Sequence, residues 1–328
     1  MDEPQPLPWE EPGWLDRVES WVGNELGRLG LEPHGRLELV RARPWAAVAR
    51  VATEAGDFWF KEPAPSLAFE PALTVAVSRQ CPDFTPEVLA TEATWLLTRD
   101  AGLQLRALIK SRDPAPSWDE LLPLYAELQI ELVDEAEELV ALGAPDKRPA
   151  MMSAAYPKLV ERVGNLAALD VKRLQALAPE LESLTEALAR PLPATLIHEE
   201  FHEANVFVRS GRARLLDWAE AAVSHPFAGL VNTFRDIAFR RKLKPNGREM
   251  LRLRSVYLEP WTPFGSPREL EELFNRGYVL GALCRAFTWD RVLAGQSESV
   301  RAEYGRNAAV WLDVIFREGI EEGVRLGE

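Results

Sequence analysis

The segment from His198 to His202 carries the side chains best suited to chemistry in this chain. Read in one frame it is His-Glu-x-x-His, which on a helix places two imidazoles one turn apart to bind zinc, with Glu199 as general base. That chemistry requires a helix. Residues 195–197 and 205–208, on either side, contain β-branched residues that favour strands. This frame therefore predicts a zinc hydrolase only if a short helix fits between two strands.

The same residues, read in a second frame, supply the groups that phosphoryl transfer needs. That reaction uses a carboxylate to orient and deprotonate the attacking hydroxyl, and oxygen ligands that hold Mg²⁺ on the polyphosphate. Glu200 offers the carboxylate, and Asn205 follows five residues later with an amide oxygen. A hairpin turning at residues 210–211 would bring Asp217 back beside Asn205. The spacing therefore predicts that Asn205 and Asp217 bind one cation.

In this second frame the chain resembles a known family. The motif His-x-Glu-x-His-x-x-Asn at 198–205, followed by Leu-Leu-Asp-Trp at 215–218, is similar to the catalytic and metal-binding segments of the aminoglycoside phosphotransferase and choline kinase-like family. The likeness extends over residues 36 to 240. It implies an α+β, two-lobed protein-kinase-like fold, with a small antiparallel-sheet N-lobe and a larger, mainly helical C-lobe. It also implies ATP and Mg²⁺ as cofactors.

The resemblance assigns nucleotide-binding roles to two upstream regions. Lys61 ends an expected strand and Glu70 lies near the start of an expected helix nine residues later, which resembles the kinase ion pair that holds a lysine on the phosphates. The stretch that resembles the linker at the family's adenine site consists of Leu97, Thr98, Arg99 and Asp100. We therefore expect phosphates near Lys61 and adenine near this linker.

The chain departs from the family pattern at the catalytic residue. The family's Asp is replaced by Glu200 and the preceding Gly by Glu199, and residues 224–226 read Ser-His-Pro where many relatives have Gly-Asp-Pro. The intrinsic pKa values of Asp and Glu differ by only about 0.4 unit, so acid strength is not the difficulty. The extra methylene changes reach, and a misplacement of about 1 Å can lower a rate on the order of 100-fold. A slow kinase, a reshaped kinase site and a binding protein without turnover all stay open.

Five further residues are candidates for supporting roles. We expect His198 and His202 to fix the catalytic loop by hydrogen bonds rather than to bind metal. Glu220 is a candidate accessory ligand for metal or substrate. The loop between the first two expected strands has no glycine, the residue that lets backbone NH groups approach phosphates most easily. Arg41 or Arg43 is therefore the candidate donor in that loop.

The elements that position these residues can be predicted from the spacing of apolar residues, whose period changes along the first third of the chain. An amphipathic helix is expected from Trp14 to Gly27 or Gly30. The following segments alternate with period two and predict an antiparallel sheet. The strands are expected at 37–40, 46–53, 58–61, 87–90 and 94–98, with a helix at 67–77.

From Trp118 onward the pattern is helical. Apolar residues spaced by three and four from Leu121 to Leu139 predict one continuous buried stripe. The acidic residues on its other faces form either a solvated surface or a wall that attracts a cationic substrate. Further helices are expected at 154–168, 171–190, 229–242, 247–257, 268–294 and 300–323, around a strand-and-loop island at 195–224.

Composition limits the class of protein. The 328 residues carry 38 Lys+Arg against 51 Asp+Glu, a formal charge of −13, which argues against a nucleic-acid clamp. No apolar run is long enough to span a membrane, and the acidic, Pro-rich start is unlike a secretion signal, so we expect a cytoplasmic protein. Cys81 and Cys284 have neither metal-type nor disulfide-framework spacing and are expected to be reduced core residues.

These observations predict three regions: an N-terminal segment and helix at 1–34, a nucleotide-binding N-lobe at 35–99 and a C-lobe at 100–328. The function expected first is an ATP-dependent phosphotransferase acting on a hydroxyl of an amino sugar, sugar or amino alcohol, with a cationic acceptor among the options. The alternatives are a nucleotide-binding pseudokinase without turnover and, less favoured, the zinc hydrolase.

Overall fold

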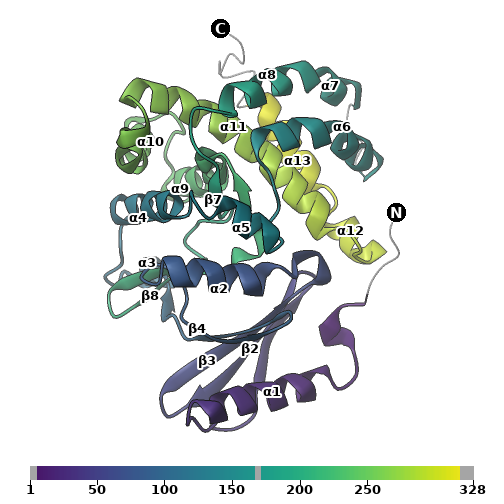
Figure 1. Ribbon diagram of the computed structural model, residues 1–328, viewed down its shortest axis with the longest axis vertical. Coiled ribbons are helices and arrows are strands. Elements are labelled where there is room, and N and C mark those ends of the chain that lie inside the picture. Colours follow the sequence, from purple (N-terminus) through teal and green to yellow (C-terminus); the bar gives the residue numbers. More distant parts are fainter. Residues whose placement is uncertain (1–5, 167–170, 318–328) are drawn as a thin grey trace.

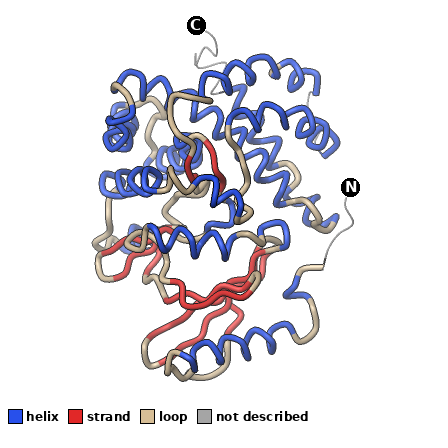
Figure 2. Tube along the Cα trace, viewed as in Figure 1, coloured by secondary structure: helices blue, strands red, loops and turns tan. Residues whose placement is uncertain are grey.

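The chain folds into two lobes, as the sequence predicts (Figure 1). The computed structural model describes residues 6–166 and 171–317. The small lobe is built on a five-stranded antiparallel sheet of order β1-β2-β3-β5-β4, drawn as the lower strands of Figure 2. Its strands are β1 (Glu38–Arg43), β2 (Ala46–Thr53), β3 (Gly56–Pro63), β4 (Val88–Glu92) and β5 (Trp95–Arg99).

Helix α1 (Trp14–Arg28) covers one face of this sheet (Figure 1). The tryptophans and aliphatic residues at its helical spacing are all buried, as expected from their period. Trp14 and Trp21 meet the ring of Phe60 on β3 edge to face, each with a centroid distance of 6.1 Å. The Trp14 indole also donates to Glu62 Oε2 at 2.6 Å. The helix and the sheet thus share one apolar cluster.

Helix α2 (Glu70–Gln80) lies between the sheet and the large lobe (Figure 1). The sequence predicts one helix over 67–77, but the structure has a short 3₁₀ turn, η2 (Pro65–Leu67), before α2 begins. Pro71 explains the start at Glu70, because proline lacks an N–H and suits the first helical turn. Glu70 is therefore at the end of α2 nearest the cleft residue Lys61.

The large lobe is mainly helical, with a small island of strands. Its helices are α3 (Leu105–Ser111), α4 (Trp118–Glu131), α5 (Ala136–Ala141), α6 (Pro149–Leu166), α7 (Val171–Ala176), α8 (Ala178–Leu188), α9 (Val231–Arg241), α10 (Arg248–Leu258), α11 (Pro267–Val292), α12 (Glu298–Tyr304) and α13 (Asn307–Val314). The island holds β6 (Leu103–Gln104), β7 (Thr195–Ile197), β8 (Val206–Arg209), β9 (Arg212–Leu215) and β10 (Ala222–Ser224). β7 pairs with β10, and β8 lies between β6 and β9. The 3₁₀ segments are η1 (Pro8–Glu10), η3 (Trp218–Glu220), η4 (Pro226–Leu230) and η5 (Glu259–Phe264).

The helical pattern expected from Trp118 onward is interrupted, because the chain turns between α4 and α5. The amides of Val133, Glu135 and Ala136 each bond to the carbonyl three residues earlier, which tightens the backbone out of α-helical geometry. The stripe residues stay buried on both sides of the turn. The apolar spacing thus identified the buried face but not the break.

Three other expected helices are also interrupted. The stretch 171–190 divides into α7 and α8, 229–242 opens with the 3₁₀ turn η4 before α9, and 300–323 gives α12 and α13. Residues 318–323 of the last prediction lie outside the described residues. The remaining expected helices match α6, α10 and α11 to within about five residues over the described part of the chain. Residues 167–168 of the helix expected at 154–168 lie outside the described residues.

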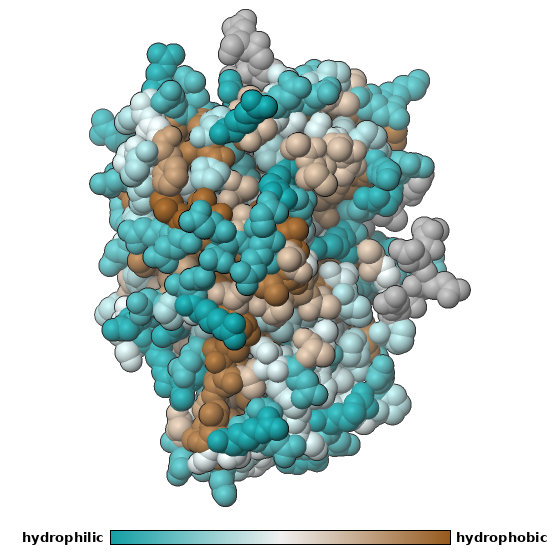
Figure 3. Space-filling model, viewed as in Figure 1, coloured by the Kyte–Doolittle hydropathy of each residue, from teal (hydrophilic) through white to brown (hydrophobic). Residues whose placement is uncertain are grey.

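The surface in Figure 3 is mainly hydrophilic, and the two cysteines are buried and form no disulfide. On the face in Figure 3, hydrophilic side chains cover most of both lobes and hydrophobic ones gather in a few patches. Cys81 and Cys284 are both free and buried, as expected. None of the helices over residues 6–166 and 171–317 is both long and apolar enough to cross a membrane.

Candidate functional site

A cavity of about 730 Å³ is lined by residues of both lobes. Lys61 and Glu70 come from the small lobe, and Asn205 and Asp217 come from the large lobe, more than 130 residues away in sequence. None of the lining residues belongs to α4 or α5, so the acidic faces of those helices do not form a wall of this cavity. Most of those acidic side chains are exposed, as a solvated face would be.

Lys61 makes two ion pairs, one with Glu70 of its own lobe and one with Asp217 of the large lobe, and we call these three residues the Lys61 cluster. Its Nζ lies 2.6 Å from Glu70 Oε1 and 2.5 Å from Asp217 Oδ1. Burial acts to lower the pKa of Lys61, but Asp217 and Glu70 outweigh it and raise the pKa, so the amine is charged. Burial raises the pKa of Glu70 to about 7 against the pull of Lys61. The pair expected from the sequence therefore exists as a contact.

Asn205 and Asp217 have the donor chemistry of a magnesium site. The Asn205 Nδ2 donates to the Glu200 carbonyl at 3.0 Å, which leaves its amide oxygen as the atom available to a cation. The Asp217 side chain is 45% exposed, and its pKa lies below the ordinary value because Lys61 overcomes the effect of burial. The Leu216 amide donates to the Asn205 carbonyl at 2.9 Å, so the two candidate ligands are held on adjoining backbone. The residues present fit Mg²⁺.

The linker after β5 contributes unevenly to the cavity. Thr98, Arg99 and Asp100 line it, whereas Leu97 is fully buried in the small-lobe core, and its side chain is not available to a ligand. The strand period explains this, because successive side chains point to opposite faces. Leu96, whose side chain points to the opposite face of the sheet from that of Leu97, lines the cavity instead.

Asp100 fixes the path of this linker. Its carboxylate accepts the Trp59 indole N–H at 2.9 Å and the Gly102 amide at 3.0 Å. Gly102 has φ of +93°, and a Cβ there would lie 2.2 Å from the Val208 carbonyl oxygen. Only glycine fits this position, so the linker is held against β8.

The hairpin between β1 and β2 lines the cavity with Arg41 and Arg43. It is fastened to the large lobe by Trp45, whose ring packs edge to face on Tyr304 with a centroid distance of 5.5 Å. Gln296 Nε2 also donates to the Pro44 carbonyl at 2.8 Å. The two arginines are therefore held over the cavity by a contact with the C-terminal helices.

Residues 198–202 form a loop between β7 and β8, not a helix. His198 Nε2 lies 3.0 Å from the Leu216 carbonyl, and because a carbonyl can only accept, this nitrogen carries the proton. Burial lowers the pKa of His198 to about 4, so the ring is neutral at pH 7. Over the described residues, no group of three or more His, Cys, Asp and Glu side chains is arranged to bind a metal. The arrangement required by the zinc-hydrolase alternative is contradicted.

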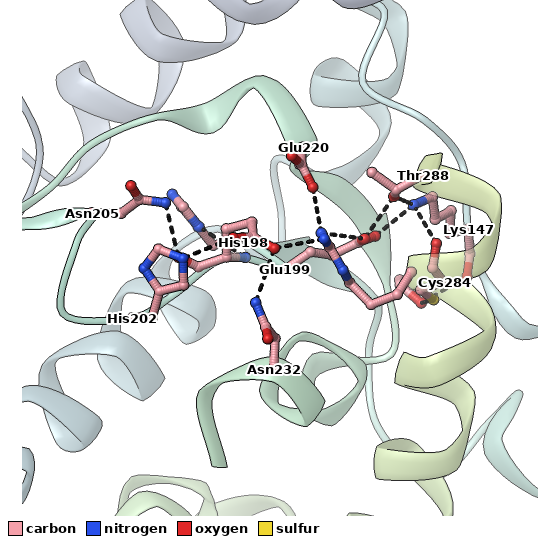
Figure 4. A network of polar contacts seen from close by, with 12 residues as sticks. Lys147, His198, Glu199, His202, Asn205, Glu220, Asn232, Cys284 and Thr288 are labelled. Atoms are coloured by element: carbon pink, nitrogen blue, oxygen red, sulfur yellow. Dashed lines mark hydrogen bonds and ion pairs between the residues drawn. The ribbon is translucent and has the colours of Figure 1, made fainter. Parts of the chain in front are cut away.

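Glu200 accepts hydrogen bonds on both of its carboxylate oxygens. Figure 4 shows the polar network of this region, with His202, Asn232 and Glu220 labelled. Its Oε2 is 2.8 Å from His202 Nε2, and its Oε1 accepts from Asn232 Nδ2 at 2.9 Å and from Arg285 Nη2 at 2.6 Å. Burial acts to raise the pKa of Glu200, but Arg285 and His202 hold it below the ordinary value. In turn Glu200 raises the pKa of His202 against the effect of burial. Glu200 is therefore an ionised carboxylate with both oxygens engaged.

Glu199, in place of the family's glycine, is buried beneath the loop. It is 1% exposed and has φ of +59°, a left-handed conformation that costs a non-glycine residue roughly 1–2 kcal/mol. Its carboxylate lies 2.5 Å from Lys147 Nζ and accepts from Thr288 Oγ1 at 2.6 Å. Lys147 also donates to the Cys284 carbonyl at 2.9 Å. A buried carboxylate is thus paired with a buried amine.

Arg285 joins these two neighbouring carboxylates to a third. It is 2% exposed, donates to Glu220, and has Nη1 3.7 Å from Glu199 Oε2 in addition to its bond to Glu200. We call Lys147, Glu199, Glu200, Glu220 and Arg285 the Arg285 network. Glu220, expected as an accessory ligand, is thereby engaged by a protein cation.

Sequence reasoning missed Lys147, Asn232, Arg285 and Thr288, which lie on distant elements. One signal was present: Arg285 is a lone charge within the apolar run 279–287 of α11. A buried charge needs a partner, and the two adjacent glutamates of the 198–202 segment are candidates. Charge within an apolar run could therefore have pointed to the pairing.

His225 takes a structural role where many relatives have Asp. It caps η4, its Nδ1 accepting from the Phe227 amide at 3.3 Å. Burial lowers its pKa to about 3, so the ring is neutral. The side chain is enclosed by α11, where a Cβ on Gly277 would come within 3.2 Å of it.

Comparison with known proteins decides the family. Residues 42–257, more than half of the chain, match the model of the phosphotransferase enzyme family (APH). The chain belongs to this family. No curated protein sequence matches this phosphotransferase-family chain.

Solved structures show that this phosphotransferase-family chain shares the fold of small-molecule kinases. A macrolide 2′-phosphotransferase type I is 17% identical to this chain, and its superposition gives a TM-score of 0.57. The alignment covers 89% of this chain and 96% of the phosphotransferase. An ethanolamine kinase from Plasmodium vivax is 14% identical, with coverages of 93% and 89% and a TM-score of 0.61. The GDP complex of aminoglycoside 2′-phosphotransferase-IIIa is 15% identical, with coverages of 94% and 99% and a TM-score of 0.58. The kinase-like fold expected from the sequence is confirmed.

Proposed function

We propose that this protein is an ATP-dependent phosphotransferase that transfers the γ-phosphoryl group to a hydroxyl of a sugar, amino sugar or amino alcohol. The observation that carries the proposal is the meeting of Lys61, Asn205 and Asp217 on one cavity between the lobes. A lysine and two oxygen ligands are the groups that hold a polyphosphate and its cation. The family match and the small-molecule kinases among its structural neighbours support this reading.

The residues of the cavity divide the work of binding a nucleotide. Lys61 would contact the phosphates, Arg41 and Arg43 would add charged donors from the hairpin, and the stretch 98–100 would border the base. Asn205 and Asp217 would hold Mg²⁺, which neutralises charge that develops on the phosphoryl oxygens. Lys61 must share Asp217 with that site, since its amine now bonds to the same carboxylate.

Glu200 would orient the acceptor and take its proton. The acceptor oxygen attacks the γ-phosphorus, the bond from phosphorus to the β–γ bridging oxygen breaks, and ADP leaves with that oxygen. The hydroxyl proton passes to Glu200. His202 and Asn232 position the carboxylate for this role, with hydrogen-bond distances of 2.8 and 2.9 Å. The longer side chain of Glu200 is thus held by several donors, which limits the loss of orientation expected from its extra methylene.

A nucleotide-binding pseudokinase is the second candidate, and a specific observation favours it. Both oxygens of Glu200 already accept hydrogen bonds, and Arg285 neutralises its charge. A carboxylate with a lowered pKa is also a weaker base. On this reading the cavity binds nucleotide and no acceptor is phosphorylated.

Thermal shift and turnover separate the two candidates. Mg²⁺ with a nonhydrolysable ATP analogue is expected to raise the melting temperature under both. ATP consumption that requires an added acceptor is expected only of the phosphotransferase. It should fall on the order of 100- to 10,000-fold in Glu200→Gln, the range for loss of a general base.

Glu203→Gln is the matched control. Glu203 is a buried carboxylate of the same loop whose nearest cation is Arg240, at 3.7 Å. Its turnover should stay within a few-fold of the parent chain. A Glu200→Gln variant with undiminished turnover contradicts the role of Glu200, and a thermal shift without turnover against any acceptor favours the pseudokinase.

A further inference from the structure

Arg285 occupies a position that bears on the charge of the acceptor. It projects from the middle of α11, and its guanidinium bonds to the carboxylates of Glu200 and Glu220. The ring of Trp311 lies 5.5 Å from the guanidinium carbon and covers it from another side. The Arg285 side chain is 3% exposed, whereas those of Glu200 and Glu220 are 20% and 24% exposed. The cation is therefore beneath two carboxylates that reach toward solvent.

The charges of the Arg285 network are close to balance. Its three carboxylates face Arg285 and Lys147 within the network. Burial raises the pKa of Glu220 to about 7 against the pull of Arg285, so this carboxyl carries only part of a negative charge near neutral pH. The remaining negative charge is therefore close to that of the two cations before any ligand binds.

A cationic ligand gains little from carboxylates that are already paired. Moving a charged amine out of water costs desolvation free energy. The protein offsets that cost only where it offers the amine an unpaired carboxylate or hydrogen bonds of good geometry. Glu200 has three donors on its two oxygens. A cation near Glu200 would also approach the guanidinium of Arg285, and the repulsion between the two positive charges would weaken its binding. An uncharged polar group meets neither difficulty.

We propose that Arg285 is a built-in cation that sets the acceptor class of this site, excluding a positively charged group beside the reacting hydroxyl and favouring an uncharged or anionic sugar. This inference rests on the proposed function and narrows it. It sets the chain apart from structural neighbours named as kinases of aminoglycosides, ethanolamine or choline, all of which carry amines or a quaternary ammonium. Arg285 acts through Glu200 and Glu220 and is a specificity-determining residue rather than a catalytic one.

Three sugars that differ at one substituent test the proposal: glucose, glucosamine and glucuronate. Their binding is measured by calorimetry on the full chain with Mg²⁺ and a nonhydrolysable ATP analogue. The wild-type chain should bind glucosamine no more tightly than glucose. Arg285→Ala, which leaves the carboxylates unpaired, should prefer glucosamine to glucose by at least tenfold, and Arg285→Lys should restore the wild-type order.

A second variant shifts the balance in the opposite direction and keeps the test independent of how Arg285→Ala folds. Glu220→Gln removes one carboxylate and leaves Arg285 in place, so the preference should move toward glucuronate by at least tenfold. Arg268→Ala is the matched control, because Arg268 is an exposed arginine at the start of α11 that pairs with Glu272. It should keep the wild-type order of the three sugars.

The outcomes distinguish this inference from the proposed function. The thermal shift with Mg²⁺ and the ATP analogue is recorded first, and its absence in the wild-type chain contradicts nucleotide binding. A normal shift combined with wild-type preference for glucosamine overturns the role of Arg285. So does an order of the three sugars that changes in neither Arg285→Ala nor Glu220→Gln.

Discussion

Lys61 and Asp217 form an ion pair that joins the two lobes across a cavity, whereas the ion pair of Lys147 and Glu199 is enclosed within the large lobe. The Lys61 cluster includes Asp217, whose side chain is 45% exposed, so a ligand can exchange with its contacts. The Arg285 network includes Glu199 and Lys147, which are 1% and 5% exposed. Ion pairs at a binding surface serve ligands, while enclosed ones must be satisfied by the protein itself. The two clusters should therefore respond differently to the loss of one charge.

The largest effect is expected from breaking the enclosed cluster. Lys147→Met leaves Glu199 buried without its cation, which should lower the free energy of unfolding by about 3–5 kcal/mol. Urea denaturation measures the loss. Glu199→Gln in addition should recover a large part of it.

Arg148→Ala is the neighbouring control for this prediction. Arg148 pairs with Asp146, and because these side chains are 33% and 19% exposed, the substitution should lower the free energy of unfolding by less than Lys147→Met, by about 1 kcal/mol. Equal losses in Lys147→Met and Arg148→Ala would show that burial does not separate the two kinds of ion pair.

Acid should weaken the lobe that holds the Arg285 network through His225. Its pKa is lowered to about 3 in the folded chain and is about 6.5 when unfolded, so below pH 6.5 only the unfolded chain gains the proton. The contribution of His225 is therefore full above pH 6.5 and is lost as pH falls toward 3. Between pH 7 and pH 4 the free energy of unfolding of His225→Asn should fall by about 3 kcal/mol less than that of the wild type. Parallel curves for the two chains would contradict this assignment.

Lys61→Ala should affect ligand binding more than stability. Loss of a charge-assisted hydrogen bond is worth about 1.5–3 kcal/mol, so affinity for Mg²⁺ with the ATP analogue should fall roughly 10- to 100-fold. Stability should fall less than in Lys147→Met, because Glu70, with a pKa raised to about 7, can take a proton near neutral pH. Calorimetry and urea unfolding on the same samples measure both quantities. A larger loss of stability in Lys61→Ala than in Lys147→Met would reverse the comparison.

The smallest effect is expected at the contact that holds the hairpin over the cavity. Gln296→Ala removes one hydrogen bond to the Pro44 carbonyl, worth about 0.5–1.5 kcal/mol. If the hairpin arginines bind phosphate, affinity for the nucleotide analogue should fall about two- to tenfold. An unchanged affinity would mean that Trp45 alone holds the hairpin.

The Lys61 cluster could be predicted from the sequence because each member belongs to a local pattern. Lys61 lies two residues before the end of strand β3, Glu70 opens a helix, and Asp217 follows a hairpin, so each belongs to a local pattern that the sequence shows. The kinase-like fold then brings them together. Leu97 was misplaced for a simpler reason, since the strand period does not say by itself which face lines the cavity.

The Arg285 network could not be predicted in the same way. Lys147 and Thr288 reach Glu199 from 52 and 89 residues away, and nothing in their own segments marks them. The motif indicates the position of a carboxylate in the sequence, but not whether a positively charged side chain of the protein already pairs with it. Long-range packing of α11 against the catalytic loop decides that.

The span of family likeness and the span of the folding unit differ in this chain. The matched residues 42–257 stop before α11 and start after α1. A fragment cut to that span would expose the sheet face that the α1 tryptophans cover, and would leave Glu199 and Glu200 without Arg285. Recombinant work should therefore retain both flanks, because they complete the core of one lobe and the charge balance of the other.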